Sequence, residues 1–217
     1  MRDTIILDMD GTLLDTLEDL HDAVNAVLAR WRCPACSLTE TRAYVGNGAT
    51  RLLELAAPAL LSSPERETVL AEFRRDYLEH CTAKARPYPG VPELLRQLRR
   101  EGFSLAVVTN KPHAAAQALG EKWFPGILVM GVADGGTRKP DPGVVDAALA
   151  RLGSSRARAV CVGDSEVDVK TAANAGVPCI CVDWGFRSRE QLRAAGASCI
   201  VSDCAALLAR LRELRRT

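Results

Sequence analysis

The stretch that decides the fold is residues 5–16, which has the sequence IILDMDGTLLDT. A short apolar run ends at two carboxylates, Asp8 and Asp10, and Gly11 then breaks the pattern. Such a run is typical of a buried strand in a parallel sheet, where both faces are covered. Sheets of this kind bind ligands at the carboxyl ends of their strands. The stretch therefore predicts that Asp8 and Asp10 lie at a functional site.

Asp8 and Asp10 also indicate the chemistry of that site. Residues i and i+2 of a strand point to the same side, so the two carboxylates repel each other unless a cation or a shared proton relieves them. Oxygen ligands favour a hard cation such as Mg²⁺. Gly11 permits a sharp departure from the strand. An isolated Asp-x-Asp pair is more often a solvated strand end, so the prediction depends on the longer motif and on its partners downstream.

The composition is ordinary for a globular protein. Of the 217 residues, 47% are hydrophobic and 25% are charged, and the formal net charge is +1. This balance gives no electrostatic reason to expect binding to nucleic acid or to a membrane. The acidic residues after Met1 leave no apolar signal region, and no apolar run is long enough to span a bilayer. The cysteines in strand-like runs behave as small buried hydrophobic side chains, so we expect a reduced, cytoplasmic setting.

Between residues 16 and 84 the hydrophobic pattern is helical. Apolar residues recur every three or four positions from Leu17 to Leu28, as on one face of a helix. A second helix is expected with Thr39 as its N-cap, and the glycine turn at residues 46–48 interrupts it. No segment of this block has the pattern of a strand. Residues 16–84 are therefore predicted to form a helical domain.

From residue 85 onward, strands and helices alternate. Strands are expected at 104–108, 127–132, 159–162, 178–182 and 198–201. Repeated strand–helix units imply a parallel sheet with helices on both sides. The predicted fold class is α/β: a doubly wound, Rossmann-like core of residues 1–15 and 85–217, with residues 16–84 inserted as a helical cap. An insert at this point emerges above the carboxyl end of the sheet and can cover the aspartate pair.

Further polar residues follow the later strands. Thr109 and Asn110 end the second strand of the core, where a hydroxyl and the amides of the next helix can hold a phosphate. Lys139 stands in a rigid Lys-Pro-Asp-Pro loop, which suits contact with a phosphoryl oxygen. Asp164 leaves the fourth strand, and Asp168 follows one helical turn later.

Each of these residues has a simpler explanation when it is taken alone. A threonine is commonly a helix cap, a loop lysine is commonly solvated, and acids in a first turn suit the helix dipole. The dipole does not explain why acids follow two separate strands. Glu166, between the two later aspartates, is expected to face solvent. Cys33 and Cys36 have metal-ligand spacing, but no second pair follows, so zinc is not expected.

Together, these segments resemble the four motifs of the haloacid dehalogenase superfamily, in order and over nearly the whole chain. The resemblance implies that Asp8 is a nucleophile that forms an aspartyl-phosphate and that Asp10 is the general acid/base. Superfamily members that cleave carbon–halogen bonds lack an acid at the position of Asp10, and members that cleave phosphonates usually lack it too. Asp10 therefore favours phosphoryl transfer. The resemblance also implies catalytic or phosphate-binding roles for Thr109, Asn110 and Lys139. The implied Mg²⁺ ligands are Asp8, the main-chain carbonyl of Asp10, Asp164 and Asp168.

The substrate is specified less sharply. Segments 44–48, 88–91 and 108–112 resemble bacterial phosphoglycolate phosphatases, which implies a small phosphorylated metabolite as substrate. Gly46, Asn47 and Gly48 would meet it in the cap, because glycine amides can approach a small anion closely.

Several alternatives remain. The glycine turn could equally be a plain turn between helices. A carboxylated substrate also needs a cation, for which Arg42, Arg51 and Lys111 remain candidates. Rival functions are a sugar-phosphate phosphatase, a hexose-phosphate mutase, a pyrophosphatase and a nucleotidase. A catalytically silent binding protein is disfavoured because Asp8 and Lys139 are both present. Either a monomer or a homodimer is compatible with the sequence.

Overall fold

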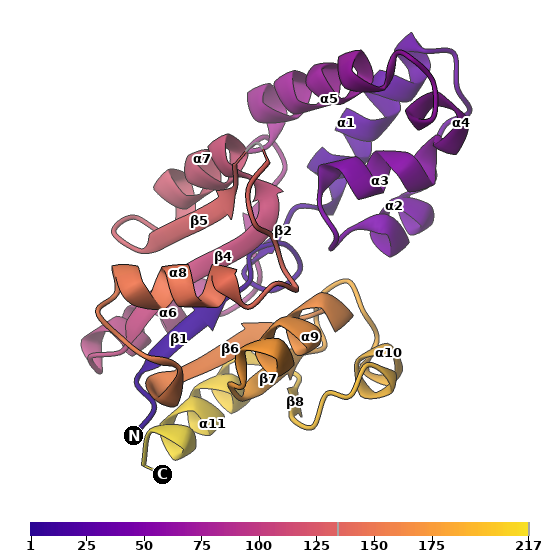
Figure 1. The fold of residues 1–217 in the computed structure, drawn as a ribbon. Helices are drawn as coiled ribbons and strands as arrows, with labels where there is room; N and C mark the ends of the chain where they lie inside the picture. The colour runs from indigo at the N-terminus through magenta and orange to yellow at the C-terminus, as the bar shows by residue number, and fades with distance from the viewer. Residues whose placement is uncertain (134, 217) are drawn as a thin grey trace.

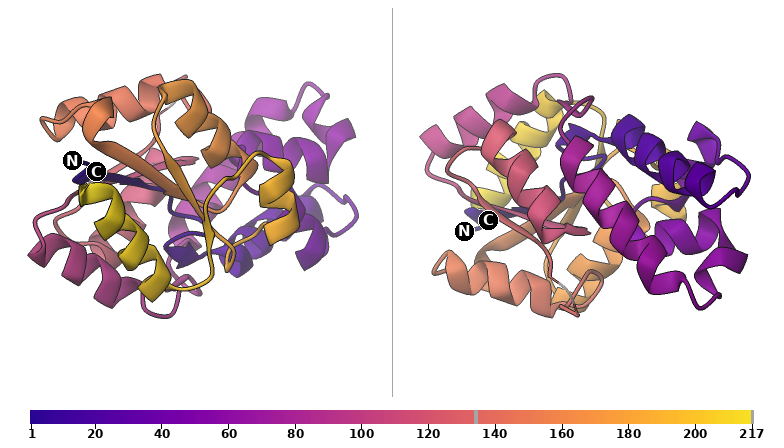
Figure 2. Two further views of the ribbon diagram at one scale, coloured as in Figure 1. Left: turned by 90° about the horizontal axis from the view of Figure 1, so that it is seen from below. Right: turned by 90° about the horizontal axis from the view of Figure 1, so that it is seen from above.

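The fold, seen in a computed structural model that describes residues 1–133 and 135–216, has two parts (Figure 1). A parallel sheet covered by helices forms one part, and a group of helices lies beyond one end of that sheet (Figures 1 and 2). The strands of the sheet are β1 (Thr4–Leu7), β4 (Ser104–Pro112), β5 (Leu128–Val132), β6 (Ala159–Gly163), β7 (Cys179–Val182) and β8 (Ile200–Val201).

The order of the sheet places the carboxyl end of β1 at its centre. The strands lie in the order β5-β4-β1-β6-β7-β8, and every neighbouring pair is parallel. The chain passes from β1 to β4 on one side and later enters β6 on the other. A parallel sheet opens a crevice where its strand order reverses in this way. The residues that follow β1, β4 and β6 therefore meet at one place.

Helices cover both faces of the sheet. They are α6 (Val91–Arg100), α7 (His113–Trp123), α8 (Gly143–Arg151), α9 (Glu166–Ala175), α10 (Arg189–Ala194) and α11 (Cys204–Arg216). Because alternate side chains of a strand point to opposite faces, Ile5 and Leu7 join a core with α6, α7 and α11. Ile6 joins a second core with α8 and α9. This arrangement confirms the doubly wound α/β prediction.

The inserted cap consists of five helices. They are α1 (Leu17–Arg30), α2 (Leu38–Tyr44), α3 (Ala49–Ala56), α4 (Pro58–Leu61) and α5 (Arg66–His80). The aromatic rings of Phe73 and Tyr77 on α5 are fully buried. The N-cap of α2 is Ser37, and the prediction of Thr39 was wrong. Ser37 and Glu40 exchange hydrogen bonds in a capping box, which satisfies two backbone amides at once and outweighs a single threonine cap.

The two crossings between sheet and cap lie side by side. β2 (Leu14–Asp15) and β3 (Arg86–Pro87) form an antiparallel pair that the sequence pattern did not predict. The buried carboxylate of Asp19 on α1 accepts hydrogen bonds from the backbone amides of Lys84 at 2.9 Å and Ala85 at 2.8 Å. These bonds hold the second crossing against the first helix of the cap. The exact division at residues 16 and 84 stays a prediction.

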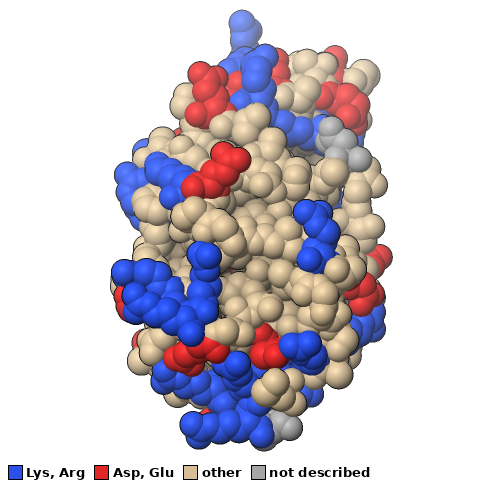
Figure 3. Space-filling view, turned by 90° about the vertical axis from the view of Figure 1, so that its left-hand side faces the viewer, with Lys and Arg blue, Asp and Glu red and all other residues tan. Residues whose placement is uncertain are grey.

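The surface is mixed in charge. On the face shown in Figure 3, basic and acidic side chains are interspersed around a central uncharged area. Within the part of the chain that the structure describes, no helix has both the length and the apolar character needed to cross a bilayer.

Candidate active site

Three buried carboxylates meet at the carboxyl ends of β1 and β6. We call Asp8, Asp164 and Asp168 the acidic cluster. One oxygen from each lies within 4.8 Å of the others. The amide of Asp8 donates to the carbonyl of Val162 at 2.9 Å, which extends the pairing of β1 with β6 up to the site. The parallel register therefore brings together residues that are more than 150 positions apart in the sequence.

The acidic cluster carries more negative charge than the protein neutralises. Burial raises the pKa of Asp8 well above its usual range, against the lowering effect of Lys139. Burial and the neighbouring Asp168 raise the pKa of Asp164 to about 7. The Lys139 ammonium lies 2.7 Å from Asp8 and 2.7 Å from Asp168. Burial alone would lower the pKa of Lys139, but these two carboxylates raise it overall.

The donor set fits a divalent cation. Three carboxylates face one ammonium, which leaves an excess of negative charge in a buried place. Carboxylate oxygens are the ligands that Mg²⁺ prefers in proteins. The acidic cluster of the structure therefore fits the predicted Mg²⁺ ligands Asp8, Asp164 and Asp168.

Neighbouring groups orient the cluster. The Asp164 carboxylate accepts hydrogen bonds from the Thr12 hydroxyl at 3.0 Å and from the Phe186 amide at 2.7 Å. The Ser165 hydroxyl donates to Asp168 at 2.6 Å. A Cβ on Gly11, whose φ is +84°, would lie 2.2 Å from an Asp164 oxygen. The glycine of the opening motif is therefore needed for the close approach of the two loops.

Asn110 organises the loop that carries Lys139. Its side-chain oxygen accepts from the Lys139 amide at 2.8 Å, and its side-chain nitrogen donates to the Lys139 carbonyl at 3.0 Å. The same nitrogen donates to the carbonyl of Gly46 in the cap at 3.1 Å. In this structure the Asn110 amide thus positions Lys139 and the glycine turn. Its predicted contact with substrate stays a prediction.

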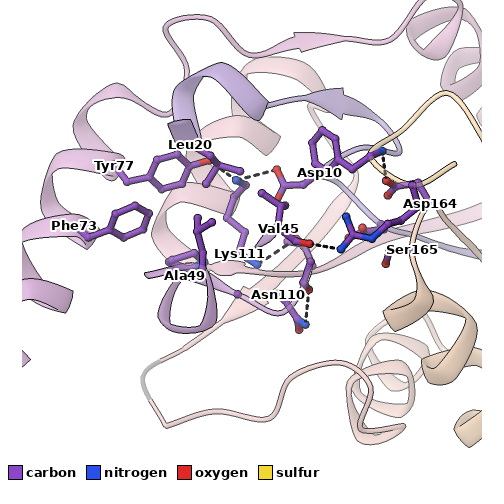
Figure 4. A pocket seen from close by; sticks show the side chains of 18 residues that line it. Asp10, Leu20, Val45, Ala49, Phe73, Tyr77, Asn110, Lys111, Asp164 and Ser165 are labelled. Carbon is purple, nitrogen blue, oxygen red and sulfur yellow. Dashed lines mark hydrogen bonds and ion pairs between the residues drawn. The ribbon is translucent and has the colours of Figure 1, made fainter. Parts of the chain in front are cut away.

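Asp10 lies beside a second buried lysine. One oxygen of Asp10 accepts from the Thr16 hydroxyl at 2.6 Å and from the Lys111 ammonium at 2.8 Å. The Lys111 ammonium also contacts the hydroxyl of Tyr77, which comes from α5 of the cap (Figure 4). Burial would lower the pKa of Lys111, but Asp10 and Tyr77 raise it overall. Lys111 therefore joins the core to the cap through charged and polar contacts.

A small cavity lies between the cap and the strand ends. Its volume of about 40 Å³ is room for roughly three water molecules. Asp8, Asp10 and Thr109 line it from the core. The cap contributes an apolar wall of Leu20, Val45, Ala49, Leu52 and Phe73, together with Gly46 and Gly48. Figure 4 labels Leu20, Val45, Ala49 and Phe73 of this wall. Asn47 is exposed and is not among the lining residues, so its predicted contact stays untested.

Arg187 was not predicted, and it ties the core to the cap. Its guanidinium donates to the carbonyls of Arg42 at 3.0 Å and Val45 at 2.7 Å, at the end of α2. It also pairs with Glu166 at 2.9 Å. Glu166, which was expected to face solvent, is partly exposed, and Arg187 draws its carboxylate into an ion pair. No sequence pattern indicates Arg187, since two of these partners are backbone carbonyls.

Comparisons with known proteins agree with this geometry. The family model described as haloacid dehalogenase-like hydrolase matches residues 5–182. A phosphoglycolate phosphatase of Mesorhizobium japonicum is 35% identical over 218 residues, which cover 98% of this chain and 96% of that protein. An N-acetylmuramic acid 6-phosphate phosphatase of Pseudomonas aeruginosa is 35% identical over 185 residues, 84% of this chain and 82% of that protein.

A solved structure agrees as well. A crystal structure of a protein from Lactobacillus delbrueckii subsp. bulgaricus has a TM-score of 0.88 and 33% identity, and it covers 97% of this chain and 99% of that chain. The motifs, the sheet order and the acidic cluster point the same way as these matches. The chain belongs to the haloacid dehalogenase-like hydrolases.

Proposed function

We propose that this protein is a Mg²⁺-dependent phosphatase that hydrolyses a small phosphomonoester, with 2-phosphoglycolate as its substrate. The observation that carries the proposal is the acidic cluster with Lys139, of which Asp8 and Asp164 line a small cavity under the cap. The relatives named phosphoglycolate phosphatase support the choice of substrate. The free cysteines of the described chain suit a reduced, cytoplasmic setting.

The reaction begins with Asp8. Its carboxylate attacks the phosphorus in line with the ester bond and forms an aspartyl-phosphate, while Asp10 gives a proton to the leaving oxygen. Asp10 then takes a proton from a water molecule, which attacks the aspartyl-phosphate and regenerates Asp8. The bonds from Thr16 and Lys111 hold the Asp10 carboxylate at this position.

Other groups bind and neutralise the phosphoryl group. Lys139 is fixed by Asn110 and faces Asp8, where it can contact a phosphoryl oxygen. The Thr109 hydroxyl accepts from the Lys111 amide at 3.2 Å, which leaves its own proton available for a second phosphoryl oxygen. Mg²⁺, held by Asp8, the carbonyl of Asp10, Asp164 and Asp168, would supply electrostatic stabilisation of the phosphoryl oxygens.

The cap acts as a lid in this proposal. Residues 16–84 close over the site and exclude bulk water, which strengthens the electrostatic contacts inside. The small cavity favours a small leaving group. The relative that acts on a muramic acid phosphate supports a sugar phosphate as the second candidate. A sugar would need a wider opening between the apolar wall of the cap and the core.

A substrate panel tests the proposal. We expect phosphate release from 2-phosphoglycolate with a kcat/KM at least about tenfold above that for N-acetylmuramic acid 6-phosphate, glucose 6-phosphate, AMP and pyrophosphate, which corresponds to about 1.4 kcal/mol. Activity should disappear in excess chelator and return with Mg²⁺. Ca²⁺ should support little turnover because its looser coordination misplaces the attacking oxygen. Full activity in chelator would contradict the metal site. If the protein preferred a sugar phosphate, that ester would replace 2-phosphoglycolate as the proposed substrate.

A further inference from the structure

We propose that Lys111 and the Tyr77 hydroxyl form a subsite for a carboxylate on the leaving group, and that this subsite selects carboxylated phosphomonoesters. The inference rests on the proposed phosphatase function and adds the residues that recognise the substrate. Its starting point is the position of the cations. Of the three candidates in the sequence, only Lys111 lines the cavity, whereas Arg42 and Arg51 are exposed on the cap.

The other cations near the cavity are already engaged. Arg187 also lines the cavity, but its guanidinium is bound to backbone carbonyls at the end of α2 and to Glu166. Lys139 lies between Asp8 and Asp168, on the side of the transferred phosphoryl group. Within the described chain, this leaves Lys111 as the cation on the leaving-group side.

Lys111 and Tyr77 have donors to spare. An ammonium has three N–H donors, and the structure gives Lys111 two side-chain partners, one oxygen of Asp10 and the hydroxyl of Tyr77. The Tyr77 hydroxyl accepts from Lys111, so its own proton remains available. Each group can therefore donate to one oxygen of a carboxylate. The side chain of Lys111 is 1% exposed, and the apolar wall around it makes such contacts stronger than at a surface.

The position of Asp10 fixes which part of the substrate lies here. Asp10 protonates the leaving oxygen in the proposed reaction, and Lys111 touches Asp10 at 2.8 Å. In 2-phosphoglycolate a single methylene separates the ester oxygen from the carboxylate. A substrate whose ester oxygen lies at Asp10 therefore brings its carboxylate to Lys111 and Tyr77. A longer spacer would carry the charge past them into the apolar wall.

The test compares 2-phosphoglycolate with ethyl phosphate, which carries a methyl group in place of the carboxylate. We expect the unmodified protein to favour 2-phosphoglycolate by about 100-fold in kcat/KM, as for a charged hydrogen bond in a buried site. Lys111→Met keeps the aliphatic stem and should reduce this preference to less than about fivefold. Tyr77→Phe should reduce it by about tenfold, and Lys111→Arg should restore part of it.

The matched control is Arg51→Met, which removes a surface cation of the cap that pairs with Glu54. Arg51→Met should leave kcat/KM for both substrates unchanged. If Lys111→Met lowers kcat/KM for both substrates by the same factor, Lys111 acts only through Asp10 and the subsite is wrong. The subsite is also wrong if the unmodified protein does not favour 2-phosphoglycolate, even when Mg²⁺-dependent hydrolysis of ethyl phosphate shows that the phosphatase proposal holds.

A binding measurement tests the subsite independently of the chemical step. In an Asp8→Asn background, calorimetry with 2-phosphoglycolate should show binding at least tenfold weaker when Lys111→Met is added, with a clearly smaller loss for ethyl phosphate. Equal binding with and without Lys111→Met overturns the subsite, whether or not the protein hydrolyses any ester. If thermal unfolding shows that Lys111→Met does not fold, Lys111→Gln replaces it in both measurements.

Discussion

Asp8 shows how one residue can serve both the fold and the proposed chemistry. Its amide continues the pairing of β1 with β6, and its carboxylate faces Lys139 at 2.7 Å. We expect Asp8→Asn to reduce turnover by about three orders of magnitude or more, because the amide oxygen is a poor nucleophile. The near-isosteric change should leave the fold intact, as measured by circular dichroism and thermal unfolding. The matched control is Asp146→Asn on the surface, where Asp146 pairs with Arg156.

The outcome of that substitution is decisive for the role of Asp8. If Asp8→Asn kept a tenth of the normal turnover in a preparation free of unmodified protein, Asp8 would not be the nucleophile. If turnover vanished together with the folded signal, the loss would be structural. A loss of turnover with normal unfolding behaviour supports the proposed role.

At the same scale, the sequence indicated some site residues and could not indicate others. Asp8, Asp164 and Asp168 each follow a strand or begin the next helix, so strand order alone brings them together. Tyr77 and Arg187 follow no such rule. Tyr77 lies on a cap helix and reaches Lys111 only through the packing of the cap. Arg187 binds backbone carbonyls, and because every residue has one, the sequence does not indicate these contacts.

Among the elements, the turn between α2 and α3 carries two glycines with positive φ, Gly46 and Gly48. Gly48 has a φ of +86°, and a Cβ there would lie 3.2 Å from the carbonyl oxygen of Asn110. We expect Gly48→Leu to lower kcat/KM for 2-phosphoglycolate by about tenfold or more, because the turn must move away from the core. The kcat/KM for a flat aryl phosphate should fall less, since this substrate needs fewer contacts with the cap.

Gly196 provides the control for backbone strain. Its φ is +95°, yet no atom lies within 4 Å of the position of a Cβ. Gly196→Leu should therefore cost stability of the same order, without changing the ratio of the two substrates. Equal losses on both substrates in Gly48→Leu would show that the turn only shapes the cap. The ratio is measured by steady-state kinetics and the stability by thermal unfolding.

For the whole molecule, metal binding and pH should be linked. Without metal, burial and Asp168 place the pKa of Asp164 at about 7 in the folded state, against 3.8 as its ordinary value. The unfolded chain then loses this proton at lower pH than the folded one. The stability that Asp164 contributes is full below about pH 4 and is lost as the pH rises through about 7. Unfolding in chelator should therefore begin at a lower temperature at pH 8 than at pH 5.

Mg²⁺ should oppose that trend. At ten times its Kd, a bound ion adds about 1.4 kcal/mol, or about 3–6 °C in Tm for a chain of this size. The gain should be larger at pH 8 than at pH 5, because protonated carboxylates bind the ion poorly. Asp8→Asn should show a smaller gain, and Asp146→Asn the same gain as the unmodified protein. A gain that does not change with pH would mean that the ion stabilises the protein elsewhere.

The fold as a whole was largely predictable because its signals are strong. Apolar strands alternate with helices of clear period, and the helical block interrupts them once, so the doubly wound core with an inserted cap follows from pattern alone. The misses are short elements whose formation depends on distant partners. β2 pairs with β3 although the whole cap separates them in the sequence. Leu192 of α10 packs against Cys181 of β7. No local period indicates either.

The pairing of β2 with β3 has a consequence for rebuilding the protein. Asp15 and Arg86 face each other in an antiparallel pair, so their Cα atoms are about 5 Å apart. A two-residue hairpin loop spans that gap, and Asn-Gly is suited to it. The segment between them can thus be exchanged for another as a cassette on the same pair of strands, provided that Thr16, which holds Asp10, is kept. Transplanting cassettes of different shape onto this base offers a direct route to phosphatases with new substrate ranges.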